Sequence, residues 1–227
     1  MDRKAMKKMF LSNKMAVVCT VLILIIVIAS LMAPLSPYDP DASNVAEKMQ
    51  GISSTHILGT DDIGRDTFTR TLYGGRISLL VGFAAMCVAV IVGTLFGTIS
   101  GYMGGAVDAF MMRIVDVFMS VPSLLFIIVV YAFMPRNLVT LVGMLAFFSW
   151  TKVARVVRAQ TLTLKERDFV IAAKALGVSQ GTIIRKHIIP NLMPQIIVSA
   201  SLSIANAILD ESTLSFLGYG VQLPMAS

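Results

Sequence analysis

Long runs of apolar residues that contain no charge constrain this chain more than any other feature. Residues 15–33 and 77–107 contain no Asp, Glu, Lys or Arg. A helix rises about 1.5 Å per residue, so about 20 such residues cross the hydrocarbon core of a bilayer. Charged residues make up only 14% of the chain, against about 25% in a soluble domain. The sequence therefore predicts an all-α, polytopic membrane protein.

Five segments approach the length of a membrane span. We predict spans at residues 15–34, 77–101, 110–134, 138–158 and 191–209. The first is longer than the apolar core of about 7–15 residues in a signal peptide, so we expect an anchor. The fourth continues past its uncharged part because Lys152, Arg155 and Arg158 share one helical face and can extend toward lipid headgroups. Pro194 is tolerated in the first turn of the fifth span because a proline there loses no helical hydrogen bond.

Lys and Arg collect on one side of the predicted membrane. Fourteen of the 19 lie in residues 1–14, at Arg113 and in residues 152–186. Because cytoplasmic loops are rich in Lys and Arg, we expect the N-terminus (1–14) and the loop at 163–189 to be cytoplasmic. Residues 35–76 and 210–227 are then external. The basic residues do not form the aromatic-interleaved stripe of a nucleic-acid site, so the net charge of +6 is assigned to orientation.

Small residues recur at every fourth position of the second span: Ala85, Ala89, Gly93, Gly97 and Gly101. Lipid gives helices no hydrophobic reason to associate, and small residues allow close packing of backbones instead. We expect this stripe to be a helix-packing face within the bundle. Contact with a partner subunit is the alternative.

The segment DFVIAAKALGVSQG, residues 168–181, lies between the fourth and fifth spans. Its apolar residues recur with helical spacing and are expected to share one face: Phe169, Ala172, Ala173 and Leu176. Gly177 is placed to end this helix in the left-handed conformation, and Ser179 is placed to cap a second short helix. The second helix is expected to end at Pro190, where the fifth span begins. The sequence therefore predicts two short helices bent around a glycine on the cytoplasmic surface.

The residues alone leave three functions open for this corner, one of them a catalytic or nucleic-acid element. Arg185 and Lys186 favour anionic headgroups, so the helix pair could lie on the membrane surface. The alanine face also admits close approach, so the corner could be a docking site for a soluble partner.

Polar residues in the third span also have alternative roles. Arg113 and Asp116 are spaced to form a pair within one helix, and a gate or subunit contact is the alternative. Ser120, Pro122 and Ser123 interrupt the apolar run. We expect a kink inside the bundle there, with a freed carbonyl that lines a cavity as the alternative.

Asp210 and Glu211 close the predicted fifth span on its external side. We expect these carboxylates to solvate the end of the helix. Attraction of a cationic substrate is the alternative.

Metal and catalytic sites are not predicted. The external loop contains four possible metal ligands, His56, Asp61, Asp62 and Asp66. Their order does not match a calcium loop, and Gly59 and Gly64 indicate turns instead. An intramembrane enzyme needs paired groups at one depth, whereas His56 and His187 are predicted on opposite sides of the membrane.

Four stretches resemble one family of transport proteins. AAKALGVSQGTIIRKHIIPN, residues 172–191, resembles the EAA loop of ATP-binding-cassette (ABC) importer permeases, with two alanines, a glycine four positions after the second and a proline beyond. Ile171 stands where the general motif has Glu. HILGTDDIGRDTFTRTLYGGRISL (56–79), GYMGGAVDAFMMRIVDVFMSVPSLL (101–125) and ESTLSFLGYGVQLP (211–224) resemble the second permease subunit of dipeptide, oligopeptide and nickel importers.

The resemblance implies a MetI-like type I importer fold in a bacterial or archaeal cell membrane. Members usually have six spans, so we expect this five-span sequence to lack the last helix. The permease is expected to bind no cofactor or metal and to catalyse no reaction, because ATP is hydrolysed on two cytoplasmic ATPase subunits. A sister permease would complete a heterodimer, and an extracellular or periplasmic binding protein would deliver peptides, nickel or chelates.

The resemblance also assigns the corner to the ATPase. Docking there would transmit closure of the ATPase pair to the fourth and fifth spans. The residues implied in this contact are Ala172, Ala173, Lys174, Ala175, Leu176, Gly177, Val178 and Ser179.

A non-transporting membrane scaffold, or an inactive truncated permease, is the alternative from another class. A secondary transporter is less favoured, because the centres of the predicted spans lack ion-coupling charges.

Overall fold

The computed structural model describes residues 9–135 and 137–220. The chain divides into two compact units, Met1–Leu79 with Gln222–Ser227, and Leu80–Val221, and each is described by itself. Within the described residues every regular element is a helix, and the isolated bridge between Thr60 and Asp66 is the only β pairing. The predicted all-α class is therefore confirmed. Most of the basic N-terminal segment, Arg136 and residues 221–227 lie outside the described part of the chain.

The first unit begins with helix α2, Lys14–Leu31. The Asn13 side chain caps it by accepting a hydrogen bond from the Ala16 amide at 3.1 Å. A short 3₁₀ turn, η1 (Ala33–Leu35), follows and carries Pro34 in its first turn. The helix thus ends a few residues before the predicted limit, because a proline does not continue a helix. Almost all of its apolar side chains are exposed, as in a helix that faces lipid.

The external-loop segment folds on itself before helix α3, Thr67–Met103, begins. It contains one more 3₁₀ turn, η2 (Val45–Glu47). Helix α3 starts at Thr67 and not at residue 77 as predicted, because Arg70 and Arg76 end the uncharged run but do not end the helix. The Asp66 side chain caps this helix by accepting from the Thr69 amide at 2.7 Å.

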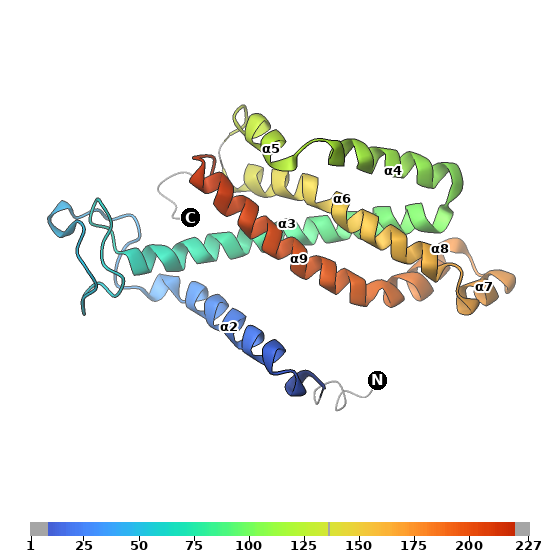
Figure 1. The fold of residues 1–227 in the computed structure, drawn as a ribbon, viewed down its shortest axis with the longest axis horizontal. Coiled ribbons are helices and arrows are strands. Elements are labelled where there is room, and N and C mark those ends of the chain that lie inside the picture. Colours follow the sequence, from blue (N-terminus) through green and yellow to red (C-terminus); the bar gives the residue numbers. More distant parts are fainter. Residues whose placement is uncertain (1–8, 136, 221–227) are drawn as a thin grey trace. The chain divides into compact units, whose positions relative to one another are not determined.

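The second unit is built around helix α6, Leu138–Leu164 (Figure 1). Helices α4 (Gly105–Ser120) and α5 (Ser123–Tyr131) pack against it, and α9 (Ile189–Phe216) packs along it in the opposite direction. Between α6 and α9 the chain forms α7 (Asp168–Ala175), α8 (Gln180–Ile183) and the π-helical turn η3 (Ile184–Ile188).

Four of the described helices are long and apolar enough to span a membrane. If the bent pair α4 and α5 forms one further span, the number of candidate spans is five. The bent pair corresponds to the predicted third span, but its two helices meet at 74° around Ser120–Ser123. Pro122 follows a residue with extended backbone, Val121, as expected for a position before a proline. The third segment is therefore broken and not a continuous span over residues 110–134.

The predicted separation at Pro190 is wrong. The chain stays helical from Gln180 through the π turn to Phe216. Pro190 lies in the first turn of α9, directly after the π turn, where the changed hydrogen-bond register accommodates its missing N–H. The second helix of the corner and the fifth span are thus one element, which extends past the predicted end at residue 209.

Candidate functional site

The corner between α6 and α9 contains two short helices, α7 and α8 (Figure 1), and Gly177 lies between them. Helix α7 ends at Ala175, and Gly177 has φ +76°, the left-handed conformation predicted for it. The Gly177 amide donates to the Lys174 carbonyl at 3.0 Å, and the Val178 amide donates to the Ala173 carbonyl at 3.1 Å. Ser179 is the residue before α8, but its hydroxyl pairs with that of Thr182 at 2.9 Å and does not cap the helix.

One side of the corner is fixed to the helical bundle. Val170 and Ala173 of α7 pack in a buried cluster with Val153 and Val157 of α6 and with apolar residues at the start of α9, such as Leu192. The Lys174 Nζ lies 4.9 Å from the centre of the Tyr102 ring at the end of α3, a cation–π contact. The corner is therefore packed against α6 and α9.

The other side of α7 is exposed and apolar. Phe169 is 41% exposed and Leu176 is 83% exposed, and Ala172 between them is also exposed. We call these three residues the outer face of α7. Ala173, which was predicted to share this face, is only 7% exposed and belongs to the buried cluster. Of the eight residues assigned to ATPase contact, Ala173 thus faces the protein itself.

Four of the five small residues of α3 lie against α6. Ala89 packs with Trp150 and Ala154 of α6, and Ala85 is fully buried. A side chain at Gly93 would lie 2.7 Å from the Trp150 carbonyl oxygen, and one at Gly101 would lie 2.8 Å from the Arg158 carbonyl oxygen. Only glycine allows the two backbones to approach this closely. Within this chain, the stripe supports contact between helices of one bundle.

Two ion pairs join α4 to α6. Arg158 donates to both carboxylate oxygens of Asp108 at 2.5 and 2.6 Å, and Ser100 of α3 donates to the same carboxylate at 2.5 Å. Arg155 donates to Asp116 at 2.6 Å. The expected pair within α4 between Arg113 and Asp116 is therefore replaced by a pair between helices. Sequence spacing on one helix could not reveal partners from another helix.

The break between α4 and α5 lines a cavity of about 190 Å³ in the second unit. Pro122 and Ser123 lie in its wall, together with Lys152 of α6 and Asp210 of α9. Ser120 is outside the lining, and its hydroxyl donates to the Val117 carbonyl at 2.7 Å. The break thus combines the expected kink with a lined cavity, which were proposed as alternatives. Lys152, Arg155 and Arg158 therefore reach protein groups or this cavity and do not simply extend to headgroups.

The expectation that Glu211 solvates a helix end is wrong. The residue is only 1% exposed, and its Oε1 accepts from the Ser215 hydroxyl at 2.9 Å. It is therefore a buried, bonded group and does not solvate a helix end. The reason is that α9 continues to Phe216, so Glu211 lies inside the helix.

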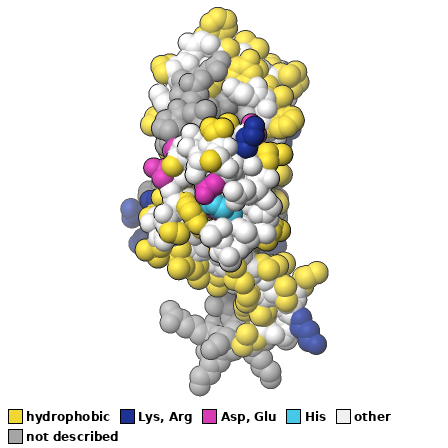
Figure 2. All heavy atoms as spheres, turned by 90° about the vertical axis from the view of Figure 1, so that its left-hand side faces the viewer, with side chains coloured by type: hydrophobic (Ala, Val, Ile, Leu, Met, Phe, Trp, Pro, Cys, Tyr) yellow, Lys and Arg dark blue, Asp and Glu magenta, His cyan; other side chains and the backbone are white. Residues whose placement is uncertain are grey.

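The acidic and imidazole groups of the external loop form internal contacts. His56 Nδ1 lies 2.9 Å from Asp66 Oδ2, and the His56 ring contacts Tyr38. Figure 2 shows a histidine side chain beside acidic ones on the face that carries this segment. Among the described residues, no three His, Cys, Asp or Glu side chains are placed to hold a metal ion.

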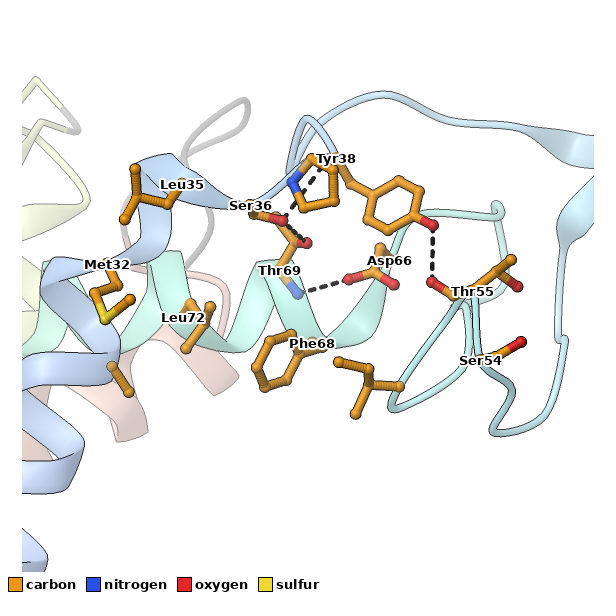
Figure 3. A pocket seen from close by; sticks show the side chains of 13 residues that line it. Met32, Leu35, Ser36, Tyr38, Ser54, Thr55, Asp66, Phe68, Thr69 and Leu72 are labelled. Carbon is orange, nitrogen blue, oxygen red and sulfur yellow. Dashed lines mark hydrogen bonds between the residues drawn. The ribbon is translucent and has the colours of Figure 1, made fainter.

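A second cavity, of about 490 Å³, lies wholly in the first unit. Figure 3 shows Met32 and Leu35 on one side and Phe68 and Leu72 on the other, while Tyr38 donates to the Thr55 carbonyl at 2.7 Å. Burial alone would raise the pKa of Asp66, but hydrogen bonds from the Thr69 amide and from His56 outweigh it and hold that pKa below its ordinary value. The sequence did not indicate this cavity, because its walls come from segments far apart in the chain.

Comparison with known proteins gives two family matches. The profile of the binding-protein-dependent transport system inner membrane component matches residues 93–227. The profile of the N-terminal TM domain of oligopeptide transport permease C matches residues 4–51.

Individual relatives match almost the whole chain. The oligopeptide transport system permease protein OppC of Bacillus subtilis is 41% identical over 219 residues, which cover 96% of this chain and 72% of the relative. The dipeptide transport system permease protein DppC of the same organism is 40% identical over 216 residues, which cover 95% of this chain and 68% of the relative. OppC of Haemophilus influenzae is 41% identical over 224 residues, covering 97% and 72%.

Proposed function

The chain belongs to the binding-protein-dependent transport system inner membrane component family, among its OppC- and DppC-like permeases, and from this we propose that it forms half of the translocation pathway of an ATP-driven peptide importer. It is a multi-pass membrane protein and a transport subunit. The names of the relatives support oligopeptides or dipeptides as cargo. Nickel or a chelate is a second candidate cargo and rests on the sequence resemblance alone.

The corner at α7 is proposed to dock on a cytoplasmic ATPase. This proposal depends on the difference between the two sides of α7. Val170 and Ala173 are buried against α6 and α9, while the outer face is apolar and exposed. An apolar surface that a chain leaves uncovered marks an interaction site. A body docked there moves α6 and α9 together, because the buried side of α7 is packed against both helices.

The remaining subunits follow from the family. ATP would be hydrolysed by two ATPase subunits, because this sequence has no GxxxxGK[ST] loop to hold phosphates. A sister permease would form the other half of the pathway, and a binding protein outside the cell membrane of a bacterium or archaeon would deliver the cargo. In this arrangement the N-terminus and the α7 corner are cytoplasmic, and the 35–76 segment is external.

Among the polar residues proposed for the pathway or gate, the cavity at the break supports only some. Pro122, Ser123 and Asp210 line it. Asp116, Ser120 and Glu211 bond to groups of the protein itself, so they are proposed to shape the pathway wall and not to contact cargo.

The coupling proposal is tested with two charge insertions on α7. Leu176→Glu places a carboxylate on the outer face, and we expect uptake to fall at least about tenfold, because an uncompensated charge at an apolar contact is costly. Ile171→Glu is the matched control: residue 171 is 53% exposed but lies outside the outer face, and Glu is the residue of the general motif there. Uptake and ATP hydrolysis are measured in purified complexes reconstituted with the binding protein, the sister permease and the ATPases.

The choice of positions depends on burial. Ala173→Glu would place a charge in the buried cluster and damage folding, so it cannot report coupling. Gly177→Pro would force a φ near −65° where the chain has +76°, and would remove the N–H that bonds Lys174. Normal uptake by Leu176→Glu in a fully assembled complex would refute docking at this face. Isolation of a homodimer without ATPases would favour the non-transporting scaffold instead.

A further inference from the structure

Two oppositely charged side chains of the second unit line one cavity: Asp210 is half-buried and Lys152 is exposed. Lys152 lies on α6 and Asp210 on α9, and both border the cavity of about 190 Å³ at the break between α4 and α5. Neither makes an ion pair or a hydrogen bond with any other residue in the described part of the second unit. Ionisable groups within membrane spans are costly, and they almost always pair or mark a pathway for a substrate or ion.

The other carboxylates in the spans of this unit are satisfied. Asp108 is bonded by Arg158 and Ser100, Asp116 by Arg155, and Glu211 by Ser215. The fold thus pairs its structural carboxylates, and Asp210 is an exception to that pattern. Its position opposite Lys152, across a cavity, places one negative and one positive group at a single site.

The cavity also lies at a break in the helical backbone. Helix α5 begins at Ser123 directly after the break, and Ser123 lines the cavity. Irregular backbone at membrane depth is tolerated where it lines a cavity, and broken helices form the cargo sites of many transporters. The hydroxyl-bearing residues Ser123, Ser149 and Thr151 add polar character to the lining.

We propose that this cavity is a contact site for the charged groups of a peptide in transit, with Asp210 accepting from its ammonium group and Lys152 donating to its carboxylate. The cavity is smaller than the range of about 300–1,000 Å³ for pockets that enclose a whole ligand, so it holds one segment of the cargo. The inference rests on the proposed import of peptides and adds the residues that touch them. A pairing of Lys152 and Asp210 with the sister permease is the competing use of the same charges.

The test traps a peptide during transport. Cys19 and Cys87 are replaced by alanine, and a single cysteine is introduced by Ser123→Cys in the cavity wall. Ser201→Cys is the matched control, because Ser201 is exposed on α9 and does not line the cavity. The probe is the tripeptide Ala-Cys-Ala with its thiol carried as a 2-thiopyridyl disulfide. The protein thiolate attacks the peptide sulfur and releases thiopyridone, which leaves the peptide attached.

The proposal predicts attachment at Ser123→Cys that requires ATP and the binding protein, and no attachment at Ser201→Cys. Asp210→Asn or Lys152→Met in the Ser123→Cys chain should each lower the yield about tenfold, because each removes a charge-assisted hydrogen bond. Assembly of every variant is checked by size-exclusion chromatography with all subunits present. Uptake of radiolabelled Ala-Ala-Ala by the unaltered complex provides the test of peptide import itself.

The possible failures are separable. Uptake of Ala-Ala-Ala without attachment at Ser123→Cys, or attachment that does not change when the charges are removed, would overturn the cavity site and leave the importer standing. Loss of the sister permease from both charge variants, with unchanged attachment in the complexes that remain, would also overturn it and assign the charges to the subunit interface. Absence of any peptide uptake would refute the proposed function and, with it, this inference.

Discussion

Asp108 and Asp116 show how burial changes the contribution of an Asp–Arg ion pair to stability. Both lie on α4 and bind an arginine of α6. The Asp108 side chain is 13% exposed and accepts three hydrogen bonds, whereas the side chains of Asp116 and Arg155 are about half exposed. Exposed ion pairs contribute about 0–1 kcal/mol, and buried ones leave a costly unpaired charge when one partner is removed.

We therefore expect Asp108→Asn to lower the free energy of unfolding by about 2–4 kcal/mol, because Arg158 and Ser100 lose a charged acceptor. Asp116→Asn should change it by less than about 1 kcal/mol. Both values are measured by titrating the purified protein from a mild detergent into a denaturing one and following helix content. Equal effects of the two substitutions would show that burial does not separate the pairs.

The buried N-cap residue Asp66 predicts that the stability of the start of α3 depends on pH. Burial opposes ionisation of Asp66, but the Thr69 amide and His56 stabilise the carboxylate more strongly, so its folded pKa lies below the ordinary value of 3.8. A lowered folded pKa contributes stability that is present above the unfolded value and is lost as the pH falls below it. Protection of the amides at the start of α3, corrected for intrinsic exchange, should therefore stay constant near neutral pH and decrease below about pH 4.

Asp66→Ala, which removes the accepting oxygen, should lower this protection already at neutral pH. Asp62→Ala, at an exposed position of the same loop, is the control and should leave it unchanged. Asp61, whose pKa is also lowered because bonds from Arg65 and Ile63 outweigh the opposing effect of burial, keeps its own acid response in both variants. The difference between the variants therefore reports Asp66, and no difference at neutral pH would exclude the cap.

At the level of single residues, the sequence indicated which types mattered but not their partners. Asp116, Lys152 and Asp210 could be recognised as charges in apolar surroundings. Their contacts depend on α4, α6 and α9 coming together, and a helix periodicity contains no information about a neighbouring helix. The pairing of Asp108 with Arg158 was missed for this reason. The presence of a carboxylate near an uncharged span was the signal available for it.

At the level of elements, the spans were predictable where the apolar run and the helix coincide. The start of α6 at Leu138 agrees with the prediction, because the Asn137 side chain caps the helix. The boundaries failed where a charge or a proline was taken as an end, as at Arg76 and Pro190. Charge limits membrane insertion, and proline limits hydrogen bonds, but neither alone ends a helix.

The contact between α3 and α6 yields a prediction for glycine. A methyl group at Gly97 would meet the Ala154 carbonyl oxygen and would lie 3.0 Å from the Arg158 amide nitrogen. Both atoms belong to backbone and cannot rotate away, so Gly97→Ala must push the helices apart, at a cost of about 1–3 kcal/mol.

Gly143→Ala on α6 is the control, because no atom lies within 4 Å of the added methyl group. Helix propensity then favours alanine by up to about 1 kcal/mol. Thermal stability in detergent, measured for both variants, should shift in opposite directions. A Gly97→Ala protein as stable as the parent would show that α3 and α6 can separate without cost.

At the scale of the whole molecule, the exposed apolar side chains fall into two groups, one on α2 and one on α7. The exposed side chains of α2, such as Ile23 and Ile25, belong to a predicted span and suit lipid. The outer face of α7 follows the charged end of α6 and lies next to Lys174, outside the apolar runs. The proposed assembly therefore assigns lipid to α2 and a protein partner to α7, and the assignment requires that α7 face the cytosol.

This orientation is predicted by the distribution of Lys and Arg and can be measured directly. In a chain without native cysteines, Ser54→Cys in the external-loop segment should react with a membrane-impermeant maleimide in intact cells. Ala175→Cys on α7 should react only after the membrane is permeabilised, and this position preserves the contact of Lys174 with Tyr102. The permease is expressed without the ATPase subunits, so both residues are exposed and a difference in labelling reports the side of the membrane and not burial. Labelling of Ala175→Cys in intact cells would place the corner outside, where no ATP-hydrolysing partner could reach it, and would end the coupling proposal.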